Sequence, residues 1–375
     1  MTLTLSARQA DLLARATATG SDLARQAPSE NPGRVDRPLL AALAEAGLLG
    51  RLYPDDGLSA MDLCLIRQGL ARTNPHAETA FALQGLGSYP IHQSARSEIA
   101  SRWIPGVVAG EIVPAFALTE PEAGSDAAAL ALAAERDGGG WRLTGDKAWI
   151  SNAPEADVYV VFARTTPGAG SRGVSAFLVP GDSPGLSGSS TEMLAPHPIG
   201  RVVFDDVAVP PEHVLGQVDA GFRVAMGTLD LFRPSVGAFA VGMAEAALDI
   251  AVRHAEERHA FGKPIFEFQA VSHSLADMAA RTTAARLLVY AAATAYDTGD
   301  HRSLTSLAAM AKLTATETAQ SVVDGAIQVL GARGLEADHP LARLYLDVRA
   351  PRIYEGTSEI QRDIIARELR KAPIY

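Results

Sequence analysis

At 375 residues the chain is long enough for about two or three domains, and its 47% hydrophobic and 20% charged residues are ordinary for a globular protein. The formal net charge of −10 argues against a nucleic-acid-binding face, which needs clustered Lys and Arg. The single cysteine, Cys64, rules out an internal disulfide and a cysteine-rich metal site, and it favours a cytoplasmic setting. The N-terminal stretch has no apolar core of signal-peptide type, and no apolar run approaches membrane-spanning length, so we expect neither a membrane nor a metal partner.

Residues 1–113 carry apolar residues at helical spacing, interrupted by Gly and Pro, which predicts an N-terminal α-helical domain. The expected helices are Leu5–Gln26, Pro38–Leu49, Met61–Arg72, Glu78–Leu86 and Ser94–Ala109.

Residues 114–222 alternate short β-branched and aromatic runs with Gly and Pro, which predicts a middle β domain, a small barrel or sandwich. Asp137–Gly140 between two apolar runs is a hairpin signal. The expected strands are Ile112–Leu118, Leu130–Ala134, Trp141–Thr144, Val158–Phe162, Val174–Val179 and Val202–Phe204.

Residues 223–375 return to long helical patterns with short connections, which predicts a C-terminal four-helix bundle. The candidate helices are 221–256, 265–297, 303–331 and 340–370. The whole chain is therefore predicted to be an α+β protein with the order helical domain, β domain, helical bundle.

The stretch Arg352–Gln361 holds one carboxylate, Glu355, followed by Gly356 and Thr357. Pro351 interrupts a helical pattern before it, and a clear helical pattern runs from 358 to 369 after it. A carboxylate on a tight turn is a candidate general base. The alternative is an ordinary acid that complements the helix dipole at a helix start.

Three further stretches could bind a ligand, and each has an ordinary structural alternative. In 116–126, hydroxyls and Gly124 follow a strand, as in an anion-binding turn or in a polar surface turn. In 143–152, Trp149 could cover a flat aromatic ligand or simply lie in the core. In 258–269, Arg258 could grip a pyrophosphate or only complement a helix dipole.

Taken together and in this order, these stretches resemble the acyl-CoA dehydrogenase family of flavoproteins. The resemblance covers roughly residues 35–371 and is strongest at TEPEAGSD (119–126), GDKAWISN (145–152), RHAFGKPI (258–265) and IYEGTSEIQ (353–361). It implies an FAD-dependent enzyme that dehydrogenates an acyl-CoA thioester at its α and β carbons, with Glu355 as the base for the α-proton. It also implies an electron-transferring flavoprotein as partner, a homotetramer or homodimer, and a role in fatty acid metabolism.

By the same resemblance, residues of three motifs and of the bundle should contact FAD: Phe116, Leu118, Thr119, Gly124, Ser125, Trp149, Ser151, Arg258, Phe261, Gln269, Gln328, Thr357 and Glu359. The substrate should lie near a second set: Ser125, Asp230, Arg233, Tyr354 and Gly356. Some branches of the family place the base on an earlier bundle helix, but Phe232 stands at that position here and cannot accept a proton.

Several alternatives stay open at this point. The thioester could be an acyl or aminoacyl group on a carrier protein, the enzyme could be a flavin oxidase or monooxygenase, or the chain could be an inactive flavin-binding paralogue. One departure from the family pattern bears on a later argument: Ala195–Gly200 replaces the usual Lys-x-Gly-x-Arg segment before the last strand.

Overall fold

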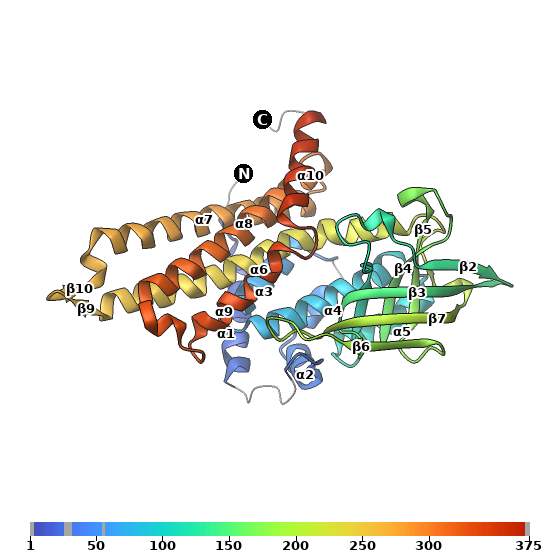
Figure 1. Ribbon diagram of the computed structural model, residues 1–375, viewed down its shortest axis with the longest axis horizontal. Helices are drawn as coiled ribbons and strands as arrows, with labels where there is room; N and C mark the ends of the chain where they lie inside the picture. The colour runs from blue at the N-terminus through green and yellow to red at the C-terminus, as the bar shows by residue number, and fades with distance from the viewer. Residues whose placement is uncertain (1–3, 26–31, 55–56, 372–375) are drawn as a thin grey trace. The chain divides into compact units, whose positions relative to one another are not determined.

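The computed structural model describes residues 4–25, 32–54 and 57–371, and it divides the chain into two compact units (Figure 1). We call the unit formed by 1–27, 57–78 and 230–375 the helical unit, and the unit formed by 28–56 and 79–229 the sheet unit. The boundaries fall inside two helices, α4 and α6, so the N-terminal helices are shared between the units. The three-domain division expected from the sequence stays a prediction.

The sheet unit contains one eight-stranded sheet with the order β6-β7-β3-β2-β4-β5-β8, and β1 pairs with β4. The strands are β1 (Pro114–Ala117), β2 (Ala133–Asp137), β3 (Gly140–Ser151), β4 (Val158–Arg164), β5 (Val174–Pro180), β6 (Leu186–Ser190), β7 (Ile199–Val209) and β8 (Val214–Leu215). The predicted hairpin at 137–140 is confirmed, because β2 and β3 pair antiparallel across it.

Both faces of β4 and β5 are covered, which explains their almost continuous apolar sequences. Tyr159 and Val161 on one face of β4 join a cluster with Trp141 and Phe204. Val160 on the other face joins a cluster that includes residues of α4 (Pro75–Ser94) and α5 (Ser97–Val108). The unit also contains α2 (Arg37–Glu45).

The helical unit is built from long helices with short connections, as the sequence predicts. They are α1 (Ala7–Ala24), α3 (Ala60–Thr73), α6 (Gly221–Glu257, from residue 230 on), α7 (Gln269–Asp297), α8 (His301–Leu330), α9 (Pro340–Asp347) and α10 (Ser358–Lys371). A two-stranded hairpin, β9 (His259–Ala260) and β10 (Lys263–Pro264), connects α6 to α7. The expectation of a single helix over 340–370 is wrong: the chain leaves helical geometry between α9 and α10, where Pro351 and Gly356 lie.

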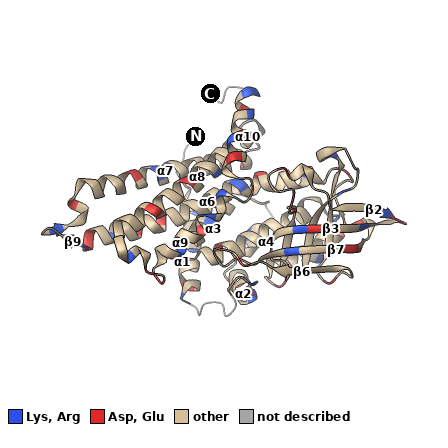
Figure 2. Ribbon diagram, in the orientation of Figure 1, with Lys and Arg blue, Asp and Glu red and all other residues tan. Residues whose placement is uncertain are grey.

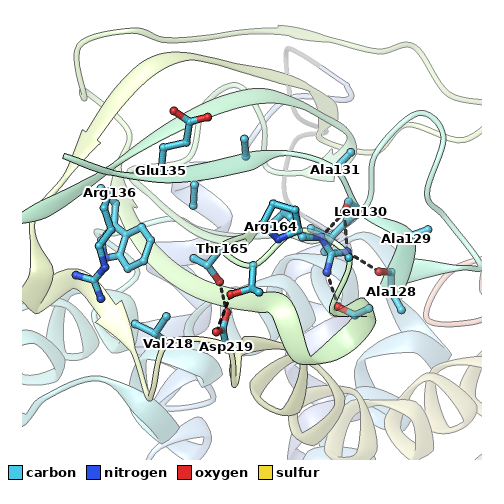
Figure 3. Close-up of a pocket in the computed structure, with 17 residues that line it drawn as sticks. Ala128, Ala129, Leu130, Ala131, Glu135, Arg136, Arg164, Thr165, Val218 and Asp219 are labelled. Carbon is cyan, nitrogen blue, oxygen red and sulfur yellow. Dashed lines mark hydrogen bonds between the residues drawn. The ribbon is translucent and has the colours of Figure 1, made fainter.

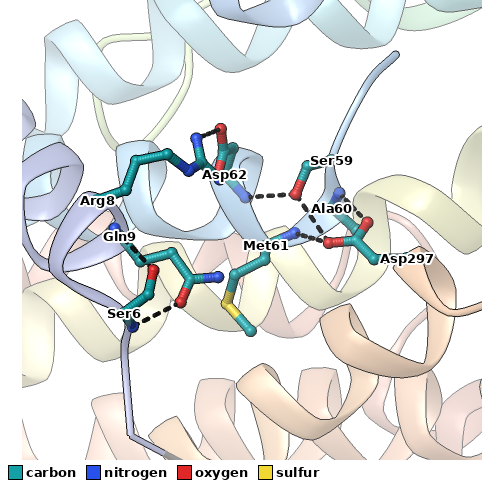
Figure 4. Close-up of polar contacts among 8 residues, drawn as sticks. All are labelled: Ser6, Arg8, Gln9, Ser59, Ala60, Met61, Asp62 and Asp297. Carbon is teal, nitrogen blue, oxygen red and sulfur yellow. Dashed lines mark hydrogen bonds and ion pairs between the residues drawn. The ribbon is translucent and has the colours of Figure 1, made fainter. Parts of the chain in front are cut away.

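Small residues let these helices approach closely. A Cβ at Gly242 of α6 would lie 2.3 Å from the backbone oxygen of Gln68 on α3, and one at Gly237 would lie 2.8 Å from a methyl of Val289 on α7. Asp297, the last residue of α7, accepts from Ser59 Oγ and from the first backbone N–H groups of α3, so it ties two distant segments together (Figure 4).

Among the described residues, one helix, α6, is long and apolar enough to cross a membrane, and 67% of its most apolar window is buried. This corrects the expectation that no segment reaches that length and apolarity, although the burial is typical of a core helix. Acidic and basic residues alternate along α10, so its surface carries mixed charge (Figure 2).

Candidate active site

Glu355 lies in a strained turn between the short 3₁₀ helix Ala350–Arg352 and α10. The φ of Glu355 is 52°, in the left-handed region that a glutamate rarely adopts. The φ of Gly356 is 92°, which a glycine adopts readily. Thr357 caps α10 by accepting from the backbone N–H of Ile360 at 3.3 Å. Strain of this kind costs about 1–3 kcal/mol and persists only where the surroundings enforce it.

Three side chains from other parts of the helical unit hold this turn through its two carbonyl oxygens. Arg233 Nε donates to the oxygen of Glu355 at 3.2 Å, and Lys312 Nζ donates to the oxygen of Gly356 at 2.6 Å. Gln361 Nε2 donates to both oxygens, at 3.3 and 2.9 Å. The backbone bearing Glu355 is therefore fixed by donors on α6, α8 and α10.

The Glu355 carboxyl lies in a buried environment rich in positive charge. Its Oε2 atom is buried and has no hydrogen-bond partner among the described residues. Burial raises the pKa of Glu355 above its ordinary value, and three nearby cations oppose that rise: Arg67, Arg233 and Lys312. A carboxylate with a raised pKa and a free acceptor position has the properties of a general base.

The cations around Glu355 are themselves buried. Arg67 is paired with Glu78 and donates to Ser235 Oγ at 2.6 Å. Burial lowers the pKa of Lys312 to about 8.

Sequence reasoning missed Arg67, Lys312 and Gln361, because each stands in an ordinary helical pattern and no motif marks it.

The predicted substrate residues of the helical unit surround the same turn. Asp230 lies 3.4 Å from Arg233 (Oδ1 to Nη1), and Tyr354 and Gly356 adjoin Glu355 in the chain. Burial is the main cause of the raised pKa of Asp230. Ser125, the remaining predicted substrate residue, is exposed and belongs to the sheet unit.

In the sheet unit, two predicted motifs meet through a buried ion pair. Lys147 is fully buried, and its Nζ lies 2.8 Å from Glu120 Oε1 and 2.9 Å from the oxygen of Leu118. The backbone N–H of Ala148 also donates to the oxygen of Thr119 at 3.0 Å. These bonds hold the 116–126 turn against the strand that carries Trp149.

Trp149 is an exposed aromatic residue on strand β3. Its side chain is 53% exposed, its φ is 52°, and the β3–β7 register shifts between Lys147 and Ile150. Such an irregularity re-aims a side chain out of the regular alternation. A flat apolar ring presented in this way, on the strand that ends at Ser151 and next to the turn that contains Thr119, fits a planar polar ligand such as a flavin.

The other predicted cofactor residues are arranged as follows. Phe116 is half-buried with its ring 4.9 Å from that of Phe162, Leu118 is buried, and Gly124 is exposed. In the helical unit, Phe261 is 95% exposed on the β9–β10 hairpin. The remaining residues are exposed or, for Thr357, half-buried: Arg258, Gln269, Gln328, Thr357 and Glu359.

A cavity of about 970 Å³ in the sheet unit contains none of the predicted site residues (Figure 3). Its central charges are already bonded: Arg164 donates to the oxygens of Ala128 and Leu130, and Asp219 accepts from Thr165 and Thr166. The cavity therefore offers no group poised for chemistry comparable with Glu355.

These features define a proton-abstracting enzyme with a place for a planar cofactor, and comparisons with known proteins agree. The acyl-CoA dehydrogenase N-terminal, middle and C-terminal domains match residues 12–111, 115–207 and 219–370. The chain is 36% identical over 347 residues to cyclohexane-1-carbonyl-CoA dehydrogenase of Geobacter metallireducens, with 90% of each chain covered. The chain belongs to the acyl-CoA dehydrogenase family and is a flavoprotein oxidoreductase of that family.

Solved structures give the same result. Butyryl-CoA dehydrogenase from Megasphaera elsdenii matches with a TM-score of 0.93 at 33% identity, over 99% of this chain and 100% of that chain. A chain from the structure described as the electron transferring flavoprotein of Acidaminococcus fermentans matches with a TM-score of 0.93 at 32% identity, over the same 99% and 100%. The comparisons support acyl-CoA α,β-dehydrogenation, and they do not favour the carrier-protein or oxidase alternatives.

Proposed function

We propose that this protein is an FAD-dependent acyl-CoA dehydrogenase in which Glu355 removes the α-proton of the thioester. The observation that carries the proposal is the buried Oε2 of Glu355, which has no hydrogen-bond partner in the described part of the chain, on a backbone held in the left-handed region. The earlier bundle helix, where some branches of the family place the base, offers no alternative here, because Phe232 stands at that position and cannot accept a proton.

The chemical difficulty is the weak acidity of the α-carbon, and the site addresses it in two ways. Burial raises the pKa of Glu355, which makes its carboxylate a stronger base than one in water. The clamp of Arg233, Lys312 and Gln361 fixes the turn, so the carboxylate does not have to be ordered during the reaction. Glu355 takes up the α-proton, and the other hydrogen leaves the β-carbon with its electron pair to give a trans-2-enoyl thioester.

FAD is the cofactor that the family and the exposed ring of Trp149 support, and when bound it supplies the acceptor for the β-hydride. Trp149, Thr119 and Ser151 of the sheet unit would hold its ring system. Arg258 and Phe261 are strongly exposed, and we assign them, with Gln269 and Gln328, to the FAD of a neighbouring copy in a homotetramer or homodimer.

The acyl group and the electron acceptor are assigned from the relatives. The names cyclohexane-1-carbonyl-CoA and butyryl-CoA dehydrogenase support a short or compact acyl-CoA as substrate. The similarity to a chain in the electron transferring flavoprotein structure supports such a flavoprotein as the acceptor. We also propose a cytoplasmic role in fatty acid metabolism, for which the single, buried and free Cys64 is the supporting observation.

Anaerobic mixing of the FAD-loaded protein with a panel of saturated acyl-CoAs tests this function. We expect the flavin absorbance to bleach, fastest with short or compact acyl groups, and the enoyl-CoA product to appear in equal amount. A protein that binds FAD but is bleached by no acyl-CoA would contradict the proposed reaction. The same panel attached to an acyl carrier protein is the comparison that separates the two carriers.

A further inference from the structure

The segment 195–200, which departs from the family pattern, brings a histidine to the end of β3. His197 Nε2 lies 2.9 Å from Ser151 Oγ, within hydrogen-bond distance. Ser151 is the last residue of β3 and stands two positions after the exposed Trp149. His197 is thus bonded to a hydroxyl that belongs to the proposed flavin surface.

The backbone around His197 is restricted by two prolines and attached to β3 by the residues that follow it. Pro196 and Pro198 flank it and restrict its conformation. The oxygen of Pro198 accepts from the backbone N–H of Asn152 at 2.7 Å, and Ser151 pairs with Ile199 in the β3–β7 ladder. Because these two attachments are made by the residues that directly follow His197, they hold this part of the chain against the end of β3, next to Ser151.

The hydrogen bond between His197 and Ser151 determines where the serine proton can point. A serine hydroxyl has one proton to donate, while its oxygen can accept from a second group. If the Nε2–H of His197 donates to Ser151 Oγ, the serine proton is left to point at an acceptor outside the pair. A flavin carries such acceptors along the edge of its ring, and a half-buried imidazole keeps the hydroxyl from turning away.

We propose that His197 is a positioning residue that orients the Ser151 hydroxyl toward the bound flavin. This inference rests on the proposed function, because it requires FAD at Trp149. It assigns a role to a segment that the family motifs leave unexplained, and it makes this flavin contact depend on two residues instead of one.

A double-mutant cycle on the FAD-loaded protein tests the inference, with FAD affinity and the flavin absorbance spectrum as readouts. His197→Leu should weaken FAD binding roughly 3- to 10-fold, the range of one lost hydrogen bond, and shift the spectrum in the same direction as Ser151→Ala. In the Ser151→Ala background, His197→Leu should add almost nothing. His197→Gln, whose amide can replace the Nε2 donor, should restore much of the loss.

Two controls separate loss of the His197–Ser151 contact from other effects of the substitution. His213→Leu removes another half-buried imidazole of the sheet unit and should leave FAD affinity unchanged. Thermal melting of each apo-variant separates loss of folding from loss of the contact. An unchanged spectrum and affinity in His197→Leu, or an equal loss in the Ser151→Ala background, would overturn the inference while the acyl-CoA panel still supports the function. Failure of the wild-type protein to bind FAD would overturn both.

Discussion

Two glutamates show how differently the two units of this protein use the same side chain. Glu120 in the sheet unit accepts from Lys147 and from the backbone N–H groups of Ala131 and Leu132, so both of its oxygens are bonded. Glu355 in the helical unit has one buried oxygen without a partner among the described residues and a backbone in the left-handed region. A fully bonded carboxylate stabilises the structure, whereas an unsatisfied one is available to take up a proton.

The largest expected change in stability comes from removing the cation that is paired with Glu120. Lys147→Met leaves the Glu120 charge buried without its cation and should lower the free energy of unfolding by about 3–5 kcal/mol, as urea titration would measure. The double variant Lys147→Met/Glu120→Gln should recover part of the loss, because no uncompensated charge remains. Equal losses in the single and double variants would show that the two residues do not act as a pair.

Gly356→Ala should be the next largest change. The glycine has φ 92°, and an added Cβ would lie 2.6 Å from Gln361 Nε2, so the variant should lose about 1–3 kcal/mol. Displacing the turn should also slow flavin reduction by the substrate about 10- to 100-fold.

Gly299→Ala is the matched control, since Gly299 has φ 68° but no atom within 4 Å of an added Cβ. Thermal melting and stopped-flow flavin reduction distinguish the two variants. Equal effects on the rate would mean that the geometry at Gly356 is not specific to the reaction.

Lys312→Met should alter the pH dependence of the reaction. The Lys312 charge favours the ionised form of Glu355, so its removal raises the pKa of Glu355 further and moves the acid limb of the rate profile to higher pH. Because burial lowers the pKa of Lys312 to about 8, the difference should disappear above about pH 8 once each profile is normalised to its own maximum, which removes the rate lost with the Lys312–Gly356 hydrogen bond. Lys371→Met, at an exposed position on α10, should leave the profile in place.

The smallest expected effect is a gain in stability. The pKa of Glu355 is higher in the folded protein than its ordinary value, so its favourable contribution is present at low pH and is lost as the pH rises through the folded pKa. Glu355→Gln should therefore stabilise the apo-protein at neutral pH, with no gain below about pH 4. Glu120→Gln should destabilise the protein, because it leaves the buried Lys147 without its carboxylate partner. Destabilisation by both variants would remove the distinction between the two carboxylates.

Much of the fold could be predicted from local patterns. The helices α1, α3 and α6 begin and end within two residues of the prediction, because their apolar spacing is clear. Strand β6, with the sequence LSGSS, was missed because it is polar and mostly exposed, so neither composition nor alternation marks it. The break between α9 and α10 was signalled by Pro351, although the range 340–370 did not separate the two helices.

The candidate site could be predicted only in part. Glu355, Gly356 and Thr357 form a continuous motif, and the chain itself places them together. Lys312 and Arg233 reach the same turn from 44 and 122 residues away, and only the packing of α6 and α8 against it brings them there. His197 was visible in the sequence as a departure from the family pattern, but its bond to Ser151 depends on the pairing of β3 with β7.

The most direct test of the central claim is the rate of flavin reduction in a single anaerobic turnover of Glu355→Gln with the best acyl-CoA of the panel. Wild type and Glu336→Gln, a change at an exposed glutamate, serve as references. We predict that Glu355→Gln retains yellow, bound FAD but is reduced about 10²- to 10⁴-fold more slowly, while Glu336→Gln behaves as wild type. Reduction of Glu355→Gln at the wild-type rate would contradict the assignment of Glu355 as the base.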